Sequence, residues 1–206
     1  MGQAVQSEGQ HTARDTAFKG ELVALIPHLR DGARVVFVVS AVEDPERKPA
    51  KMAGFRGGRY VSAEASARGE WEPGGSTVGG FDAYATTKQA SLAAAIELAR
   101  ENPRLCIHAV EPGFNPGTSL GGREVNALVR FIAGAVAPML PYVMKGASTS
   151  KRAARVLTQL LTAESAETGV YYDEKGAPMR GSERVHDPEF TRRVVRETRA
   201  FLQQHP

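Results

Sequence analysis

Two runs of mostly apolar residues stand out from the polar background of this chain, the first of them rich in β-branched valine. They are Arg34–Val39 and Leu105–Val110. A continuous apolar run of this length, in place of an alternating one, is typical of a strand buried on both faces, as in a parallel sheet. A shorter run, Gly169–Tyr172, predicts a third strand, closed by an Asp-Glu-Lys-Gly turn.

Apolar residues recur with helical spacing around these strands. A helix is expected over about 21–29, stopped by Asp31-Gly32, and a second, rich in Ala and Leu, runs to about Arg100 with Asp82 as its cap. Three more helices are predicted at about 123–137, at 150–162, and from Asp187-Pro188 onward. This alternation of helices and strands implies right-handed crossovers and a parallel α/β sheet.

Three stretches do not follow that pattern. Residues 1–20 are polar and are expected to form a tail in front of one domain at 21–206. Residues 41–81, rich in Gly, Pro, Glu and Arg, are predicted to be a long loop insertion, functional or partly disordered. The most apolar segment, 131–144, is short for a membrane span and is interrupted by prolines, so we expect no membrane association.

The composition narrows the function further. A net charge of +3 and the absence of a basic run with interleaved aromatics argue against a nucleic-acid partner. A single cysteine, Cys106, excludes an intrachain disulfide and suits a cytoplasmic location. The histidines lack metal-ligand spacing: His108 is interpreted as a strand residue and the others as surface residues, so no metal site is predicted.

The candidate chemistry starts with Tyr84 and Lys88, four residues apart near the start of a predicted helix. Residues at this spacing share a helix face, so the ammonium can lie near the phenol and favour the phenolate. A tyrosine tuned in this way can exchange a proton with an alcohol or a carbonyl oxygen. The spacing alone also fits a solvated lysine beside a half-buried tyrosine.

Two further features lie where strands end, and ligands of parallel sheets gather there. Ser40 follows the first apolar run and could donate to a substrate oxygen, or could only close the strand with a local hydrogen bond. The loop after the second strand contains Pro112, Gly113 and Thr118. Its glycine would let the backbone approach a flat ligand, although the loop could also be a plain turn.

Taken in order, these three motifs resemble the short-chain dehydrogenase/reductase family over roughly residues 20–200. The family has a serine at the end of its fifth strand, then Tyr-x-x-x-Lys on the next helix, then a Pro-Gly loop after the sixth strand. The Pro-Gly-Phe-Asn-Pro-Gly-Thr-Ser-Leu stretch looks most like the branch of protochlorophyllide reductases and retinol dehydrogenases. The resemblance implies a partial Rossmann-like, doubly wound parallel sheet whose strands are equivalent to the last three of that fold.

The resemblance also implies roles. Tyr84 would be the general acid/base, Lys88 would lower its pKa and hold the nicotinamide ribose, and Ser40 would steady the substrate oxygen. Pro112, Gly113 and Thr118 would border the nicotinamide of NAD or NADP. The expected reaction is hydride transfer between that cofactor and a small alcohol or carbonyl compound, apolar if the residues of 123–144 line its pocket.

The chain departs from the family at its start. The Thr-Gly-x-x-x-Gly-x-Gly turn, the Asn-Asn-Ala-Gly segment and the tetrad asparagine are all missing, so the nucleotide-binding βαβ units are expected to be absent. Three alternatives follow. The chain could be an oxidoreductase; it could be a truncated, catalytically impaired homologue that acts as a binding or homo-oligomer partner; or Met1 could be a misjudged start of a longer protein.

Overall fold

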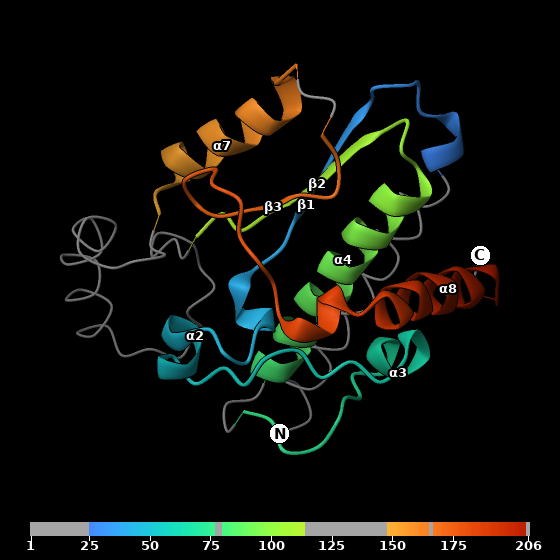
Figure 1. Ribbon diagram of the computed structural model, residues 1–206. Helices are drawn as coiled ribbons and strands as arrows, with labels where there is room; N and C mark the ends of the chain where they lie inside the picture. The colour runs from blue at the N-terminus through green and yellow to red at the C-terminus, as the bar shows by residue number, and fades with distance from the viewer. Residues whose placement is uncertain (1–24, 77–79, 114–147, 165–166, 205–206) are drawn as a thin grey trace.

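A computed structural model of the chain describes residues 25–76, 80–113, 148–164 and 167–204. In this part of the chain, three parallel strands form a sheet with helices on both faces (Figure 1). The strands are β1 (Arg34–Val38), β2 (Cys106–Val110) and β3 (Tyr171–Tyr172), in the spatial order β1-β2-β3. The predicted parallel α/β sheet is thus confirmed. The expected tail, 1–20, and the expected helix at 123–137 lie outside the described residues.

The pairing of β1 with β2 fixes the direction of each backbone group. The register runs from Arg34 opposite Cys106 to Val38 opposite Val110. The Val39 N–H donates to the Val110 carbonyl at 2.9 Å. Because backbone groups alternate in direction along a strand, the N–H and C=O of Val38 point away from β2. Among the described residues β1 is therefore an edge strand.

Helices α4 (Phe81–Glu101) and α7 (Ser150–Thr162) cover opposite faces of the sheet, and α8 (Pro188–Gln204) packs on the outer side of α4 (Figure 1). The predicted helix at 150–162 is confirmed, as is the start of the last helix at Pro188. Shorter elements connect these layers: η1 (Ile26–His28), η2 (Ala41–Glu43), α2 (Lys48–Met52), α3 (Ala63–Ala67) and η4 (Glu183–His186).

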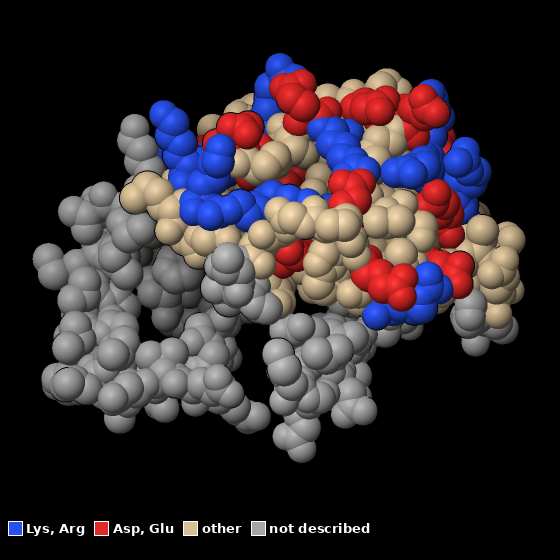
Figure 2. Space-filling model, turned by 90° about the horizontal axis from the view of Figure 1, so that it is seen from below, with Lys and Arg blue, Asp and Glu red and all other residues tan. Residues whose placement is uncertain are grey.

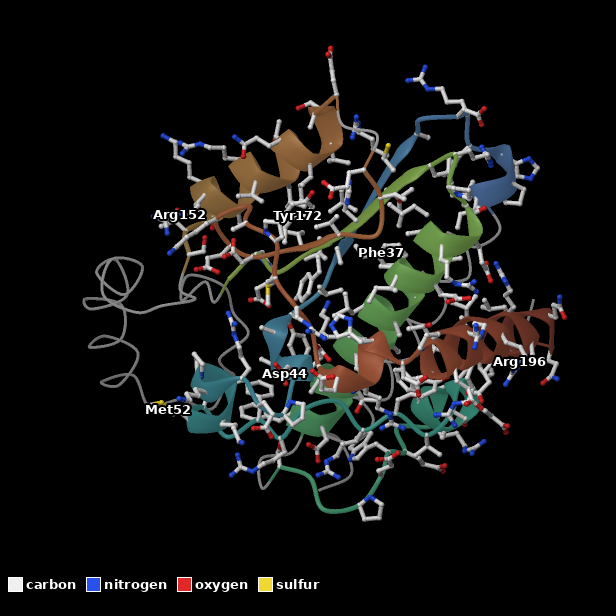
Figure 3. The ribbon with its side chains drawn as sticks, viewed as in Figure 1. Phe37, Asp44, Met52, Arg152, Tyr172 and Arg196 are labelled. Carbon is white, nitrogen blue, oxygen red and sulfur yellow. The ribbon has the colours of Figure 1, made fainter. Side chains whose placement is uncertain are left out.

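Helix α4 forms the centre of the core because it lies between the sheet and α8. Leu92 and Leu98 are at most 1% exposed, and they pack in one cluster with Ile107 of β2 and Val194 of α8. Many of its other positions are alanines, whose small side chains let the layers approach closely. Figure 3 shows the same division between core and surface, with Phe37 inside and the side chain of Met52 outside.

The expectation that β1 is buried on both faces was wrong. Val38 is 45% exposed, and Arg34, Val35 and Val36 are only partly buried. Burial on both faces requires packed layers above and below the strand, and that cover is incomplete at β1, which has only β2 beside it among the described residues. The helix expected over 21–29 is described only from Leu25, which is α-helical and is followed by a 3-10 turn at Ile26–His28.

The expected long loop at 41–81 is, in its described part, a structured segment. It contains η2, α2 and α3, and Tyr60 within it is 1% exposed. The Tyr60 hydroxyl donates to Glu197 of α8 at 2.9 Å, and Arg184 donates to the Tyr60 carbonyl at the same distance. The Arg59 guanidinium donates to backbone carbonyls of the turn at 72–74. One buried aromatic anchor and two arginines therefore hold a Gly-rich sequence in place.

Asp82 was predicted to cap the helix from outside, and this was wrong. The capping position is Gly80, whose φ of +82° suits a glycine, and Asp82 lies in the first turn of α4. Its carboxylate accepts the Ser76 N–H and hydroxyl at 2.9 Å. The equivalent prediction for Asp187 is confirmed, because its side chain accepts the Glu189 N–H at 2.9 Å.

Candidate functional site

Tyr84 and Lys88 share one face of α4, as their spacing predicted. The Lys88 Nζ lies 5.5 Å from the centre of the Tyr84 ring. In the first two turns of α4, Phe81, Tyr84 and Lys88 are partly exposed, whereas the residues between them are buried. These three side chains therefore form the only accessible stripe on the first two turns of this otherwise buried helix.

Lys88 connects this stripe to the end of β1. Its Nζ donates to the Val38 carbonyl at 3.2 Å, one of the backbone groups that point away from β2. Ser40 follows two residues later and is partly exposed. The structure thus brings Ser40, Tyr84 and Lys88 to the edge of the sheet formed by the carboxyl ends of the strands, which we call the carboxyl edge.

Pro112 and Gly113 lie at the same carboxyl edge, directly after β2. Both are partly exposed, and Gly113 has a φ of +79°, in the left-handed region that favours glycine. The turn therefore requires the glycine that the sequence supplies. Thr118, the remaining residue of the predicted set, lies outside the described residues.

Glu111 also belongs to this edge, and sequence reasoning gave it no role. Its carboxylate accepts the Ala41 N–H just after β1 and the Gly113 N–H at 3.2 Å just after β2. Burial raises its pKa, while hydrogen bonds from the Ala41 backbone, the Ser40 side chain and the Gly113 backbone oppose that rise. An acidic residue placed directly after a mostly apolar strand was the signal that could have identified it.

A second buried acid, Glu43, lies close by in η2. It is fully buried, and it accepts the Ser182 N–H at 2.8 Å and the Ser182 hydroxyl at 2.6 Å. Burial raises its pKa to about 7, and the charge of Glu111 contributes to that rise. Glu43 ties η2 to the segment before η4, so its role is to hold the strand exit in place.

An aromatic cluster lies beside Tyr84. Phe55 and Phe81 stack with their ring centres 4.0 Å apart, and Phe55 lies 6.4 Å from the Tyr84 ring in a tilted arrangement. All three are partly exposed. Phe55 comes from the segment expected to be a loop insertion, where an isolated aromatic residue gives no periodic signal. The candidate site therefore has an apolar wall on one side of the phenol.

The donors at the carboxyl edge fit one end of a nicotinamide cofactor. An ammonium, a phenol and a hydroxyl can each form hydrogen bonds with ribose hydroxyls or with a substrate oxygen, and Gly113 presents no side chain to a ligand. The pyrophosphate end needs a glycine-rich turn between a strand and a helix. In residues 25–76, 80–113, 148–164 and 167–204 no strand leads into such a turn.

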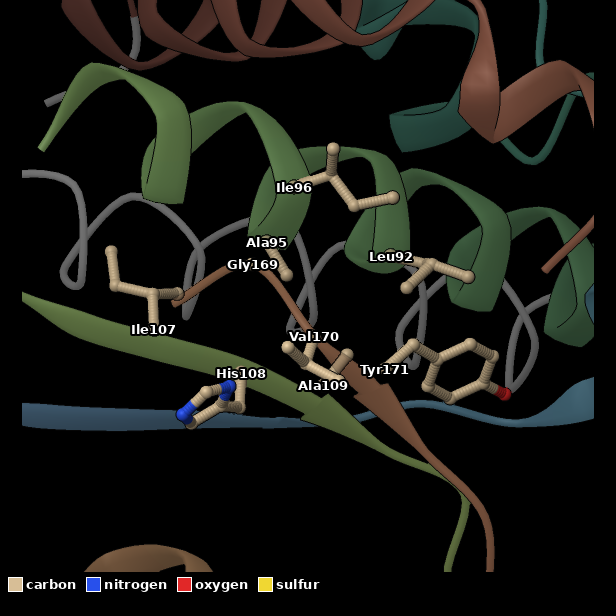
Figure 4. Close-up of a pocket in the computed structure, with 9 residues that line it drawn as sticks. All are labelled: Leu92, Ala95, Ile96, Ile107, His108, Ala109, Gly169, Val170 and Tyr171. Atoms are coloured by element: carbon tan, nitrogen blue, oxygen red, sulfur yellow. The ribbon is translucent and has the colours of Figure 1, made fainter. Parts of the chain in front are cut away.

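A packing gap between the later turns of α4 and the sheet does not contribute to this site. Figure 4 shows its lining, which includes Leu92, Ile107 and Tyr171, and the gap has no room for a water molecule. His108 lies in β2, 3% exposed, with its ring against Tyr172 at 5.4 Å. Burial lowers its pKa, and within the described part of the chain no cluster of metal-binding side chains occurs.

The surface shows no accumulation of one charge on the face drawn in Figure 2, where basic and acidic side chains are interspersed. Within the ranges that the structure describes, no helix combines the length and the apolar character that crossing a bilayer requires.

Comparisons with known proteins add little to this geometry. No protein-family profile matches the chain, and no curated protein matches it. In structure, the chain is similar to an uncharacterized protein from Mycobacterium paratuberculosis that was solved by crystallography, with 16% sequence identity and a TM-score of 0.43. The match covers 84% of this chain and 51% of that protein, so the chain spans about half the length of that structure.

Proposed function

We propose that this chain is an oxidoreductase of the short-chain dehydrogenase/reductase type, with a partial Rossmann-like sheet. It would transfer a hydride between NAD or NADP and a small apolar alcohol or ketone. The observation that carries the proposal is the contact of Lys88 Nζ with the Val38 carbonyl at 3.2 Å. It joins a Tyr-Lys pair on α4 to the strand exit at Ser40, where parallel sheets bind their ligands.

Each residue then has a distinct task. Tyr84 gives a proton to the carbonyl oxygen during reduction and takes it back from the alcohol during oxidation. Lys88, whose Nζ lies 5.5 Å from the centre of the Tyr84 ring, stabilises the phenolate electrostatically. Ser40 donates to the same oxygen and reduces its developing charge. Pro112 and Gly113 border the nicotinamide, which supplies the hydride when bound. The Phe55–Phe81 pair beside Tyr84 supports an apolar substrate.

Cofactor binding is the first test of this proposal. A ligand that binds only the native state raises Tm in proportion to ln(1 + [L]/Kd). We expect NADH or NADPH at millimolar concentration to raise the Tm of the full chain. No rise with either cofactor would count against the oxidoreductase.

A Tyr84→Phe variant tests the mechanism separately. It retains the ring against Phe55 but removes the hydroxyl, so we expect cofactor binding to persist and turnover to be lost. Tyr172→Phe is the matched control, because Tyr172 of β3 packs edge-on against His108 and lies outside the Tyr84–Lys88 stripe. Equal turnover in wild type and Tyr84→Phe would remove Tyr84 from the acid/base role.

The outer edge of β1 favours a second candidate function, binding to another copy of the chain. The backbone groups of Val36 and Val38 point away from β2, and although Lys88 binds the Val38 carbonyl, strand edges with outward-facing N–H groups invite pairing. Val38 is 45% exposed, so a lysine at this position should block pairing along the edge of β1. Val61 is 41% exposed and lies outside the sheet, so the same substitution there serves as the control. Light scattering should give a smaller mass for Val38→Lys than for Val61→Lys; equal masses would exclude the edge.

A further inference from the structure

Phe55 and Phe81 form an aromatic pair that remains partly exposed beside Tyr84. Their rings stack with the centres 4.0 Å apart and the planes 4° from parallel. Tyr60, the aromatic anchor of the same segment, is 1% exposed. A pair that only anchored the segment would gain most from equally complete burial, because aromatic rings stabilise a fold through the apolar surface they remove from water. Phe55 and Phe81 therefore retain apolar surface for a further contact.

The backbone around Phe55 fixes the place of its ring. The Phe55 N–H donates to the Ala50 carbonyl of α2 at 3.0 Å, and the Arg56 guanidinium donates to the Phe55 carbonyl at 3.0 Å. Gly54 makes the turn after α2 with a φ of +96°, and a Cβ there would lie 3.6 Å from the Phe81 ring. A surface that is already ordered loses little conformational entropy when a ligand packs on it.

The Phe55 ring is also close to the proposed reacting groups. Its centre lies 6.4 Å from that of the Tyr84 ring at an interplanar angle of 54°, and Lys88 Nζ lies 5.5 Å from the centre of the same Tyr84 ring. Aromatic rings pack favourably with centres about 4.5–7 Å apart and in tilted arrangements. A ring on the carbon that bears the reacting oxygen is only a few bonds from the Tyr84 hydroxyl, and Phe55 is placed to contact such a ring.

We propose that Phe55 is a specificity-determining residue that selects substrates with an aromatic ring attached to the reacting carbon. The inference rests on the proposed function, in which Tyr84 exchanges a proton with the substrate oxygen. Pairing of two aromatic rings raises affinity about two- to tenfold beyond the effect of apolar burial alone. The substrate class is therefore aryl ketones and the corresponding aryl carbinols, in preference to alkyl compounds of the same size.

Ligand binding tests this inference without any turnover. Saturation-transfer NMR on the full chain measures Kd for 1-phenylethanol and for 1-cyclohexylethanol, whose saturated ring is similar in size. Wild type should bind the phenyl compound about two- to tenfold more tightly. Phe55→Leu should abolish that preference, and Phe55→Tyr, which keeps the ring, should retain it. Phe201→Leu is the matched control, because Phe201 is also partly exposed but belongs to the last turn of α8, far from α2 (Figure 1).

A second measurement uses wild type alone and so does not depend on how the variants fold. Addition of 1-phenylethanol should shift the ring proton resonances of Phe55, assigned by their loss in Phe55→Tyr, and should leave those of Phe201 in place. Unshifted Phe55 resonances would overturn the inference. Equal Kd values for the two alcohols in wild type, or the wild-type preference in folded Phe55→Leu, would overturn it as well.

The catalytic consequence is tested with acetophenone and cyclohexyl methyl ketone. The carbonyl carbon receives the hydride of NADH or NADPH, and the oxygen receives the Tyr84 proton. The ratio of kcat/KM for acetophenone to that for cyclohexyl methyl ketone should be about two- to tenfold lower in Phe55→Leu than in wild type. Phe201→Leu should keep the wild-type ratio. A wild type that reduces neither ketone would refute the proposed reaction for these compounds, and the NMR measurements would then decide the role of Phe55.

Discussion

Replacing Glu43 by glutamine should stabilise the protein at neutral pH. Glu43 is fully buried, and its pKa is raised to about 7 from an ordinary 4.5. Between those values the native state retains a proton that the unfolded state has lost, so stability falls as the pH rises. At pH values above 7 the loss amounts to about 3 kcal/mol. Glutamine cannot ionise, so it removes this loss of stability. It also keeps both hydrogen bonds to Ser182, because its amide oxygen accepts the Ser182 N–H and its amide nitrogen donates to the Ser182 hydroxyl.

Urea unfolding over a pH series measures this effect. Wild type and Glu43→Gln should have equal stability near about pH 4 and diverge by about 3 kcal/mol at about pH 8, a rise in Tm of roughly 6–12 °C for a chain of this size. Glu183→Gln is the control, because the Glu183 side chain is 92% exposed. The buried acid Glu111 is present in all three proteins, and Glu43→Gln also removes the repulsion between the two acids, which is part of the expected gain. Parallel stability curves for wild type and Glu43→Gln across this range would refute the reasoning.

Three further predictions concern the packing that supports the site. Leu98→Ala, at 1% exposure in α4, should lower the free energy of unfolding by about 2–5 kcal/mol, whereas Leu161→Ala, at 48% exposure, should cost far less; urea melts compare them. Gly181→Ala should cost about 1–3 kcal/mol, because a Cβ there would lie 2.6 Å from Leu92 Cδ2; an unchanged urea midpoint would contradict this. Asp187→Ala removes the cap on the Glu189 N–H and should lower the free energy of unfolding by about 1 kcal/mol, seen as a lower Tm.

The strands and long helices were predictable because their signals are local. The continuous runs at 34–39 and 105–110 and the periodic pattern at 150–162 each specify an element without reference to the rest of the chain. The segment 41–76 was not predictable for the opposite reason. Its order comes from distant partners, such as the bond of Tyr60 to Glu197, and composition shows only its glycines and prolines.

The candidate site divides in the same way. The Tyr84–Lys88 spacing predicts a shared helix face, and the contact at 5.5 Å confirms it. Glu111 and Phe55 could not be found by spacing, because one acts across two strand exits and the other approaches Tyr84 from a separate segment. Their roles follow from three-dimensional contacts that no short motif encodes.

The parallel pairing of β1 with β2 has a consequence for how the site assembles. Arg34 and its partner Cys106 are separated by about seventy residues, and closing a loop of that size costs about 4 kcal/mol of chain entropy. Helix α4 and β2 are joined by a short connection and need no such closure. We therefore expect Tyr84 and Lys88 to belong to an early-folding unit and Ser40 to a strand that docks late and detaches first. Amide hydrogen exchange should be slowest in α4 and faster in β1, so that the site opens on the Ser40 side while the Tyr-Lys pair stays folded.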